Sequence, residues 1–297
     1  MVKLISAFAP AKLNLFLHVT GRRADGYHEL DSVFIPITLG DRIALEVRPS
    51  PRPVVALRGS FGDLPADDRN LAVRAALDFM TEFAVTAEVL IELRKAIPAG
   101  AGLGGGSSDA AAVFLMMAAL FRRESIDEPE RLARVAVKIG ADVPFFLNPV
   151  PARVTGIGEH IAPLGVSPQL ALVVAVPRIE VNTAVVFREL KPVDWSGAAA
   201  DEDVRAIMTG GVSPRLFVND LARLAMERWP EIARVKERLE EVGASAAAMT
   251  GSGAGVFGIF ASPAEAQNAA AALRRRDPAL IAVACGIYRG KAERKSL

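Results

Sequence analysis

The spacing of hydrophobic and polar residues predicts strands and helices that alternate irregularly along the chain. Residues 11–20 alternate strictly, which places Leu13, Leu15, Leu17 and Val19 on one face of a strand and Lys12, Asn14, Phe16 and His18 on the other. Further strands are predicted at residues 41–48, 54–58, 86–94, 170–177 and 281–288. Helices are predicted at residues 68–84, 110–120, 129–139, 181–190, 216–227, 231–241 and from Ser262 to about Arg276. This irregular order favours an α+β fold over a doubly wound sheet.

Helix-capping residues and prolines indicate where some elements begin or end. Asp67 or Asp68 is expected to cap the helix at 68–84, and Ser262 forms a capping box with Glu265. The joint Asn148-Pro149-Val150-Pro151 is typical of a boundary between domains. We therefore predict domains at residues 1–152 and 153–297, with the alternative that the last strand returns to the N-terminal domain.

Composition excludes several classes of protein. The 297 residues include 35 basic and 34 acidic side chains, a balance that argues against a mainly electrostatic nucleic-acid binder. Cys285 is the single cysteine and only three histidines occur, so neither a disulfide nor a zinc site held by the protein is expected. Polar residues interrupt the hydrophobic N-terminus, which indicates a cytoplasmic protein without a membrane segment.

Residues 98–112, PAGAGLGGGSSDAAA, form a glycine-rich loop that leads directly into an apolar helix. Glycine lets the backbone approach a ligand closely, and a helix N-terminus presents free N–H groups to a polyphosphate. The loop therefore predicts nucleotide binding. A Walker-type loop would have lysine where Ser107 stands, and a dinucleotide loop would directly follow a strand. A flexible linker would not run straight into a helix.

Three ordered motifs, at residues 10–34, 98–112 and 249–260, resemble the GHMP kinase superfamily of small-molecule kinases. The segments GADVPFF at 140–146 and FVND at 217–220 fit the same superfamily. The resemblance implies a two-domain α+β GHMP kinase fold. Its N-terminal domain would be similar to the second domain of ribosomal protein S5, and its C-terminal domain would be ferredoxin-like.

The first motif, PAKLNLFLHVTGRRADGYHEL, is most similar to one branch of that superfamily. The branch phosphorylates the 2-hydroxyl of 4-diphosphocytidyl-2-C-methyl-D-erythritol in the non-mevalonate isoprenoid precursor pathway. The resemblance implies ATP as phosphoryl donor, Mg²⁺ as its companion, and a monomer or weak homodimer. Alternatives are a kinase for homoserine, mevalonate or a sugar, an RNA-binding protein that uses the S5-like domain, and a dinucleotide oxidoreductase.

The resemblance assigns the catalytic pair to Lys12 and Asp142. Asp142 would accept or orient the hydroxyl proton, while Lys12 would stabilise the developing negative charge and keep Asp142 ionised. Without the motifs, the less favoured alternative for Asp142 is a turn cap between Gly140 and Pro144. Lys12 could simply be a lysine on an edge strand.

The predicted ATP-binding residues lie mainly in the glycine loop. Ser107 or Ser108 would donate a hydroxyl to a phosphate or to Mg²⁺, although serine there also suits helix capping. No dense carboxylate cage is evident, so we expect Mg²⁺ to be held largely by ATP and water. The role of Asp109 is left open, because its charge would repel a nearby triphosphate. The full set is Pro98, Gly100, Gly102, Leu103, Gly104, Gly105, Gly106, Ser107 and Ser108, with Asn70 and Lys95 near the adenosine.

The remaining family positions concern the cytidine substrate. Tyr27 and Phe187 would sandwich the cytosine ring, and His28 would read its edge. Phe187 alone would otherwise be taken for helix core, and the glycine turn near residue 251 for a simple β-turn. The predicted set is Asn14, Tyr27, His28, Thr183, Phe187, Gly251, Ser252 and Gly253.

Overall fold

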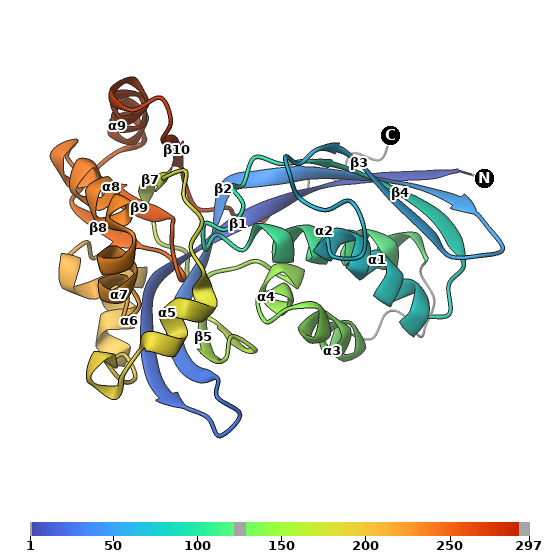
Figure 1. The fold of residues 1–297 in the computed structure, drawn as a ribbon, viewed down its shortest axis with the longest axis horizontal. Helices are drawn as coiled ribbons and strands as arrows, with labels where there is room; N and C mark the ends of the chain where they lie inside the picture. The colour runs from blue at the N-terminus through green and yellow to red at the C-terminus, as the bar shows by residue number, and fades with distance from the viewer. Residues whose placement is uncertain (1, 122–128, 291–297) are drawn as a thin grey trace.

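A computed structural model describes residues 2–121 and 129–290, which fold around two β-sheets (Figure 1). β1 (Lys3–Arg22) and β2 (His28–Pro49) form a long antiparallel ribbon at the centre of the larger sheet. That sheet has the order β3 (Val54–Ser60), β4 (Ala87–Arg94), β2, β5 (Ala152–Gly156) and β6 (His160–Pro163), and β1 pairs with β2. The smaller sheet has the order β10 (Ile281–Cys285), β7 (Ala171–Val176), β9 (Val256–Phe260) and β8 (Ala246–Met249).

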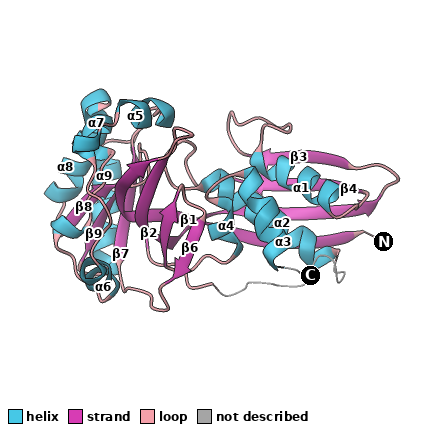
Figure 2. Cartoon of the chain, turned by 90° about the horizontal axis from the view of Figure 1, so that it is seen from below, coloured by secondary structure: helices cyan, strands magenta, loops and turns pink. Residues whose placement is uncertain are grey.

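Helices cover the sheets in layers (Figure 2). The larger sheet packs on α1 (Leu71–Glu82), α2 (Gly105–Leu120), α3 (Pro129–Ile139) and α4 (Val143–Leu147). The C-terminal half contains α5 (Thr183–Glu189), α6 (Asp201–Met208), α7 (Ala222–Arg228), α8 (Pro230–Glu241) and α9 (Pro263–Arg276). Two short 3₁₀ turns span Pro192–Asp194 and Pro214–Leu216. In the part of the chain that the structure describes, no helix combines the length and apolar character needed to cross a membrane.

α2 is the central helix because it is apolar on every side rather than amphipathic. Residues 108–114 are all buried, including the polar Ser108 and Asp109. A helix that is hydrophobic all round lies inside a protein. The glycine loop is therefore fixed to an element that cannot move without disturbing the core.

The pairing of β1 with β2 shifts register at three places, and two of these irregularities flank Lys12 and Asn14. The register shifts between Pro10 and Ala11, and again between Asn14 and Leu17. Bulges bend a strand and redirect its side chains. The predicted common face for Leu13, Leu15, Leu17 and Val19 is consequently wrong: the first two pack with Phe16 in one core cluster, and the last two in another.

The structure confirms the α+β class and most of the predicted elements, with corrections at their ends. Asn70, rather than Asp67 or Asp68, caps α1, since its side-chain oxygen accepts the Ala72 N–H at 3.0 Å. α2 begins five residues earlier than predicted, at Gly105 inside the glycine loop. α4 and α6 were not predicted, since each is too short for a periodic pattern to be detected.

The predicted division into residues 1–152 and 153–297 stays a prediction. β5 starts at Ala152 and pairs with β2 in the larger sheet, so the strand after the proline joint belongs to that sheet. β10 pairs with β7 in the smaller sheet. Just beyond β10, the chain returns to β2, where the Tyr288 N–H donates to the Pro36 carbonyl at 2.8 Å.

The glycine loop needs glycine at position 104 for two reasons. Gly104 has φ +70°, a left-handed conformation that side chains resist, and it is the N-cap of α2. A Cβ there would lie 2.8 Å from the Phe146 ring and 3.1 Å from Lys12 Cγ. Gly100 has a similar φ of +67° but open space where a Cβ would point.

We predict that Gly104→Ala destabilises the protein more than Gly100→Ala does. Both variants pay the left-handed cost of roughly 1–2 kcal/mol. Only Gly104→Ala adds the overlap with Phe146, worth about 1–3 kcal/mol in a packed core. Urea unfolding of both variants measures the difference, and equal losses would contradict the close packing at Gly104.

Candidate active site

The ammonium of Lys12 is the buried charge around which the site is built. Its side chain is 5% exposed, and Nζ donates to Asn14 Oδ1 at 2.5 Å. Asp142 Oδ2 lies 3.6 Å from Nζ, and the Phe34 ring centroid lies 4.5 Å away. Burial lowers the pKa of Lys12, while the nearby charge of Asp142 acts in the opposite direction. The structure therefore brings together the two residues predicted as a catalytic pair.

Asn14 is held rigidly, which orients Lys12. Its backbone N–H donates to Thr250 Oγ1, and its side-chain amide donates to Ser32 Oγ, both at 2.9 Å. Ser32 in turn donates to the Phe16 carbonyl. The two bonds from Asn14 fix the orientation of the side-chain amide, so Asn14 Oδ1 stays directed at Lys12 Nζ.

Asp142 stands at the N-terminus of α4 but does not cap it. No side-chain capping bond is formed there, although the position suits one. The carboxylate is 30% exposed and points to Lys12 instead. The capping interpretation of Asp142 is therefore wrong in this structure, and the carboxylate is accessible to a ligand.

Two glycine segments meet beside Lys12. The Lys12 N–H donates to the Leu103 carbonyl at 3.0 Å, and the Gly255 N–H donates to the Ala101 carbonyl at 3.1 Å. Asn219 supports the second segment, because its side-chain amide donates to the carbonyls of Met249 and Gly251 at 2.9 and 2.8 Å. The turn at residues 250–255 thus closes against the loop at residues 98–104.

The first turn of α2 contributes further polar groups. Ser108 Oγ is buried and has no hydrogen-bond partner among the described residues. Such an orphaned hydroxyl is uncommon in native proteins and often marks a missing ligand or water. Gly106 is exposed and Ser107 is half-buried at the same helix end.

Asn70 and Lys95, the predicted adenosine residues, are occupied by protein contacts. Asn70 caps α1 and also donates to the Pro65 carbonyl at 2.9 Å. Lys95 Nζ forms ion pairs with Asp41 at 2.5 Å and with Asp109 at 2.8 Å. Their contact with ATP stays a prediction.

A second cluster gathers several of the predicted cytidine residues. The rings of His28 and Phe187 lie 5.5 Å apart at 32°, and Trp195 meets His28 edge-on at 6.0 Å. Burial lowers the pKa of His28, and the charge of Arg22 lowers it further, so the imidazole is neutral at neutral pH. Its Nε2 is buried without a partner in the described chain.

The other predicted substrate residues lie in different surroundings. Tyr27 is 62% exposed at the tip of the β1–β2 hairpin, and no ring contact joins it to Phe187 within residues 2–121 and 129–290. Thr183, at the start of α5, shares a 2.7 Å hydrogen bond with Ser252 in the second glycine turn. Two motifs far apart in the sequence are thus in direct contact.

Two neighbours of these clusters were missed by sequence reasoning. Thr250 precedes the glycine turn and accepts the Asn14 N–H, while Trp195 lies in a segment without periodicity. A signal existed for Thr250, as the only polar residue between an apolar run and the turn. No pattern identified Trp195.

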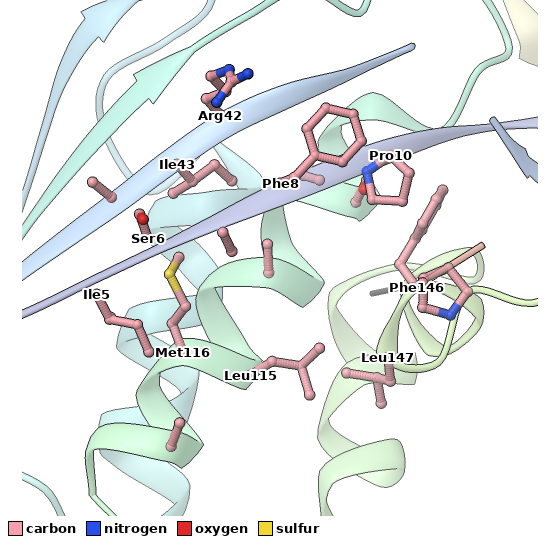
Figure 3. A pocket seen from close by; sticks show the side chains of 18 of the residues that line it. Ile5, Ser6, Phe8, Pro10, Arg42, Ile43, Leu115, Met116, Phe146 and Leu147 are labelled. Atoms are coloured by element: carbon pink, nitrogen blue, oxygen red, sulfur yellow. The ribbon is translucent and has the colours of Figure 1, made fainter. Parts of the chain in front are cut away.

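One groove among the described residues is separate from these clusters. It has a volume of about 590 Å³ and lies beside the first half of β1, bordered by α2 and α4 (Figure 3). Ile5, Phe8, Leu115 and Met116 are among its mostly apolar lining residues. Ser108 is the one predicted site residue that lines it, so the groove does not mark the Lys12–Asp142 site.

Comparison with known proteins assigns the chain to a family. Residues 70–148 match the model of the GHMP kinase N-terminal domain, and residues 218–279 match that of the GHMP kinase C-terminal domain. A homoserine kinase structure from Cytophaga hutchinsonii shares the fold at a TM-score of 0.71 and 20% identity, over 96% of this chain and 95% of its own. The predicted two-domain GHMP kinase fold is thereby confirmed.

Nearer relatives share one name. The 4-diphosphocytidyl-2-C-methyl-D-erythritol kinase of Deinococcus radiodurans is 40% identical over 91% of this chain and 89% of the relative. The Thermus thermophilus kinase of that name is also 40% identical, over 90% of this chain and 91% of its own. A crystal structure of 4-(cytidine 5'-diphospho)-2C-methyl-D-erythritol kinase matches 96% of this chain and 100% of its own, at a TM-score of 0.83 and 38% identity. With this identity over nearly its whole length, the chain belongs to the 4-diphosphocytidyl-2-C-methyl-D-erythritol kinase family.

Proposed function

We propose that this protein transfers the γ-phosphoryl group of ATP to the 2-hydroxyl of 4-diphosphocytidyl-2-C-methyl-D-erythritol. The observation that carries the proposal is the buried Lys12 ammonium, which faces a partly exposed Asp142 carboxylate where two glycine segments meet. Phosphoryl transfer requires positioning and charge neutralisation more than covalent help from the protein. This arrangement supplies both.

Asp142 is the group that orients the acceptor hydroxyl and takes its proton. Its carboxylate is free of capping bonds, so its lone pairs are available. Lys12 stabilises the charge on the transferring phosphoryl group, because its Nζ uses one donor on Asn14 and retains others. Direct in-line transfer between the two substrates needs no phosphorylated enzyme.

The N-terminus of α2 binds the triphosphate. Backbone N–H groups at residues 104–107 are free of helical partners, and the helix dipole favours negative charge there. The orphaned Ser108 hydroxyl is a further donor close to the same helix end.

Mg²⁺ fits this site as an ion bound chiefly by the nucleotide. No cluster of three His, Cys, Asp or Glu side chains occurs within residues 2–121 and 129–290, so phosphate oxygens and water would supply most of its ligands. The partly exposed Asp142 is the carboxylate nearest to Lys12 that such an ion could meet. When bound, the ion neutralises phosphate charge.

Phe187, His28 and Tyr27 recognise the cytosine. Phe187 provides a stacking face, and the neutral His28 beside it offers one donor and one acceptor to the edge of the base. Tyr27, exposed on the hairpin, provides the opposite face. Thr183 begins the helix that carries Phe187, and its hydrogen bond to Ser252 in the glycine turn places both hydroxyls where they would contact the diphosphate.

The direct test is a coupled assay of ADP release with purified protein, ATP and Mg²⁺. We expect turnover of the cytidine diphosphate substrate and little or none of homoserine, mevalonate or free methylerythritol phosphate. A higher kcat/KM for homoserine or mevalonate would show that the chain acts on a different alcohol.

The catalytic pair is tested by Asp142→Asn and Lys12→Ala. Asp142→Asn keeps the shape and removes the charge, and should lower kcat by roughly 10²–10⁴. Lys12→Ala should lower kcat by about 10²–10³. Asp201→Asn, which changes a carboxylate with 79% exposure in the C-terminal half, is the matched control and should leave kcat unchanged. A near-normal kcat would remove the changed residue from the reaction.

Base recognition is tested by Phe187→Ala. Loss of one stacking face is worth about 1–3 kcal/mol, so the KM of the cytidine substrate should rise roughly fivefold to over a hundredfold while the KM of ATP stays nearly constant. Tyr27→Ala should act similarly, and Tyr27→Phe should be mild. Phe61→Ala, at a half-buried ring in the other half of the molecule, controls for general loosening. Equal losses for both nucleotides would reduce Phe187 to a packing residue.

A further inference from the structure

Three charged side chains form a buried cluster directly beneath the glycine loop. Lys95 Nζ lies 2.5 Å from Asp41 Oδ2 and 2.8 Å from Asp109 Oδ2. The side chains of Asp41 and Asp109 are at most 3% exposed, and that of Lys95 is 10% exposed. Burial of three charges is costly unless each is compensated, so the cluster is not an incidental surface ion pair.

The cluster connects three segments that the loop depends on. Asp41 belongs to β2, Lys95 directly follows β4, and Asp109 lies in the second turn of α2. Asp41 Oδ1 also accepts the N–H groups of Ala96 and Ile97 at 2.6 and 2.8 Å. These two residues lead into the loop, so one carboxylate fixes the path by which the chain enters it.

The ammonium of Lys95 lies next to Gly105, the first residue of α2. A Cβ on Gly105 would lie 3.1 Å from Lys95 Nζ and 2.9 Å from Ile97 Cγ2. The absence of a side chain at Gly105 therefore gives the ammonium its place against the first residue of the helix. From there Lys95 holds Asp109, one turn further along the same helix.

The charge of the cluster suits a neighbouring triphosphate. Burial raises the pKa of Asp109 to about 8, with Lys95 opposing the shift and Asp41 adding to it. The raised pKa weakens the charge of Asp109, and its Oδ2 faces Lys95 Nζ at 2.8 Å, so the Asp109 carboxyl adds little repulsion toward the phosphates.

We propose that Asp41, Lys95 and Asp109 position the phosphate loop, and that Lys95 acts on ATP through the loop rather than by contact. The cluster clamps the first turns of α2 to the β2–β4 edge. The N–H groups of residues 104–107 then stay directed at one point, where the phosphates bind. This inference rests on the proposed function, since it gives the loop its ligand.

The test uses calorimetric binding of a non-hydrolysable ATP analogue, with CDP binding as the control for an intact second site. Asp109→Leu keeps the volume and removes the acceptor for Lys95, while Asp109→Asn keeps an acceptor. We expect Asp109→Leu to weaken the analogue about tenfold to a hundredfold, the effect of a small displacement in a positioned site. Asp109→Asn should stay within about threefold of the wild type, and CDP binding should change in neither.

A double variant separates positioning from contact. Lys95→Met should weaken binding of the analogue as much as Asp109→Leu does. The double variant Lys95→Met/Asp109→Leu should bind no worse than either single variant, because each single change already removes the same Lys95–Asp109 ion pair. The double variant replaces both partners by apolar groups, which proteins tolerate better than the loss of one partner. It can therefore be measured even if a single variant folds poorly. Multiplied losses in the double variant would mean that Lys95 contacts ATP itself and would overturn the proposal.

Three further results are decisive. Normal analogue binding by Asp109→Leu, or equal weakening of the analogue and CDP, would show that the cluster has no selective effect on the loop and would overturn the positioning role alone. Wild-type protein that bound no ATP analogue would overturn the proposed function together with the positioning role.

Discussion

β1 and β2 pair along nearly their full lengths, from Lys3 opposite Val47 to Arg22 opposite His28, and both halves of the molecule are built on this ribbon. Its first part, within the larger sheet, packs on α1–α4, and its second part packs on the smaller sheet. The bulges on either side of Lys12 and Asn14 fall where the ribbon passes from one core to the other. The candidate site thus lies between two irregularities of the ladder, where side chains can be redirected.

The site contains two buried lysines with opposite electrostatic balance. Lys12 has a single carboxylate partner, Asp142, which is partly exposed and 3.6 Å away. Lys95 has two buried carboxylates within 2.8 Å. A buried positive charge is costly unless negative charge lies close to it. Of these two lysines, Lys12 is the one whose charge is incompletely balanced by the protein, so it can attract an incoming anion. Lys95 is already satisfied by the protein, which suits a structural position behind the loop.

The sequence predicts the local features of this site well. Lys12 and Asn14 were placed on one face of a strand from the local pattern alone, whereas the pairing of Lys12 with Asp142 came from the family resemblance, and the two side chains lie together in the structure. The glycine loop and the apolar helix after it were also predicted, because both are recognised from adjacent residues: a run of glycines and a run of apolar side chains. Such features need no knowledge of the tertiary fold.

Long-range contacts could not be predicted in the same way. Thr250 reaches Asn14 across 236 positions, and nothing in the local pattern indicates that partnership. Asp109 illustrates the same limit, since its helix was predicted but the direction of its carboxylate depends on Asp41 and Lys95. Asn70, rather than the nearby aspartates, caps α1. The tertiary path of the chain determines which side chain lies next to the free N–H, and the local sequence does not show that path.

The outer edge of β1 is covered in turn by segments from both halves of the chain. Leu103 accepts the Lys12 N–H, Val218 accepts that of Leu17, and the Asp220 carboxylate accepts that of Val19 at 2.7 Å. A fragment that ended near residue 152 would keep the ribbon but expose these last two N–H groups along a bare hydrophobic strand. Such an edge invites pairing with other chains. The N-terminal half therefore depends on residues 218–220, supplied much later in the chain, to protect the edge of its first strand.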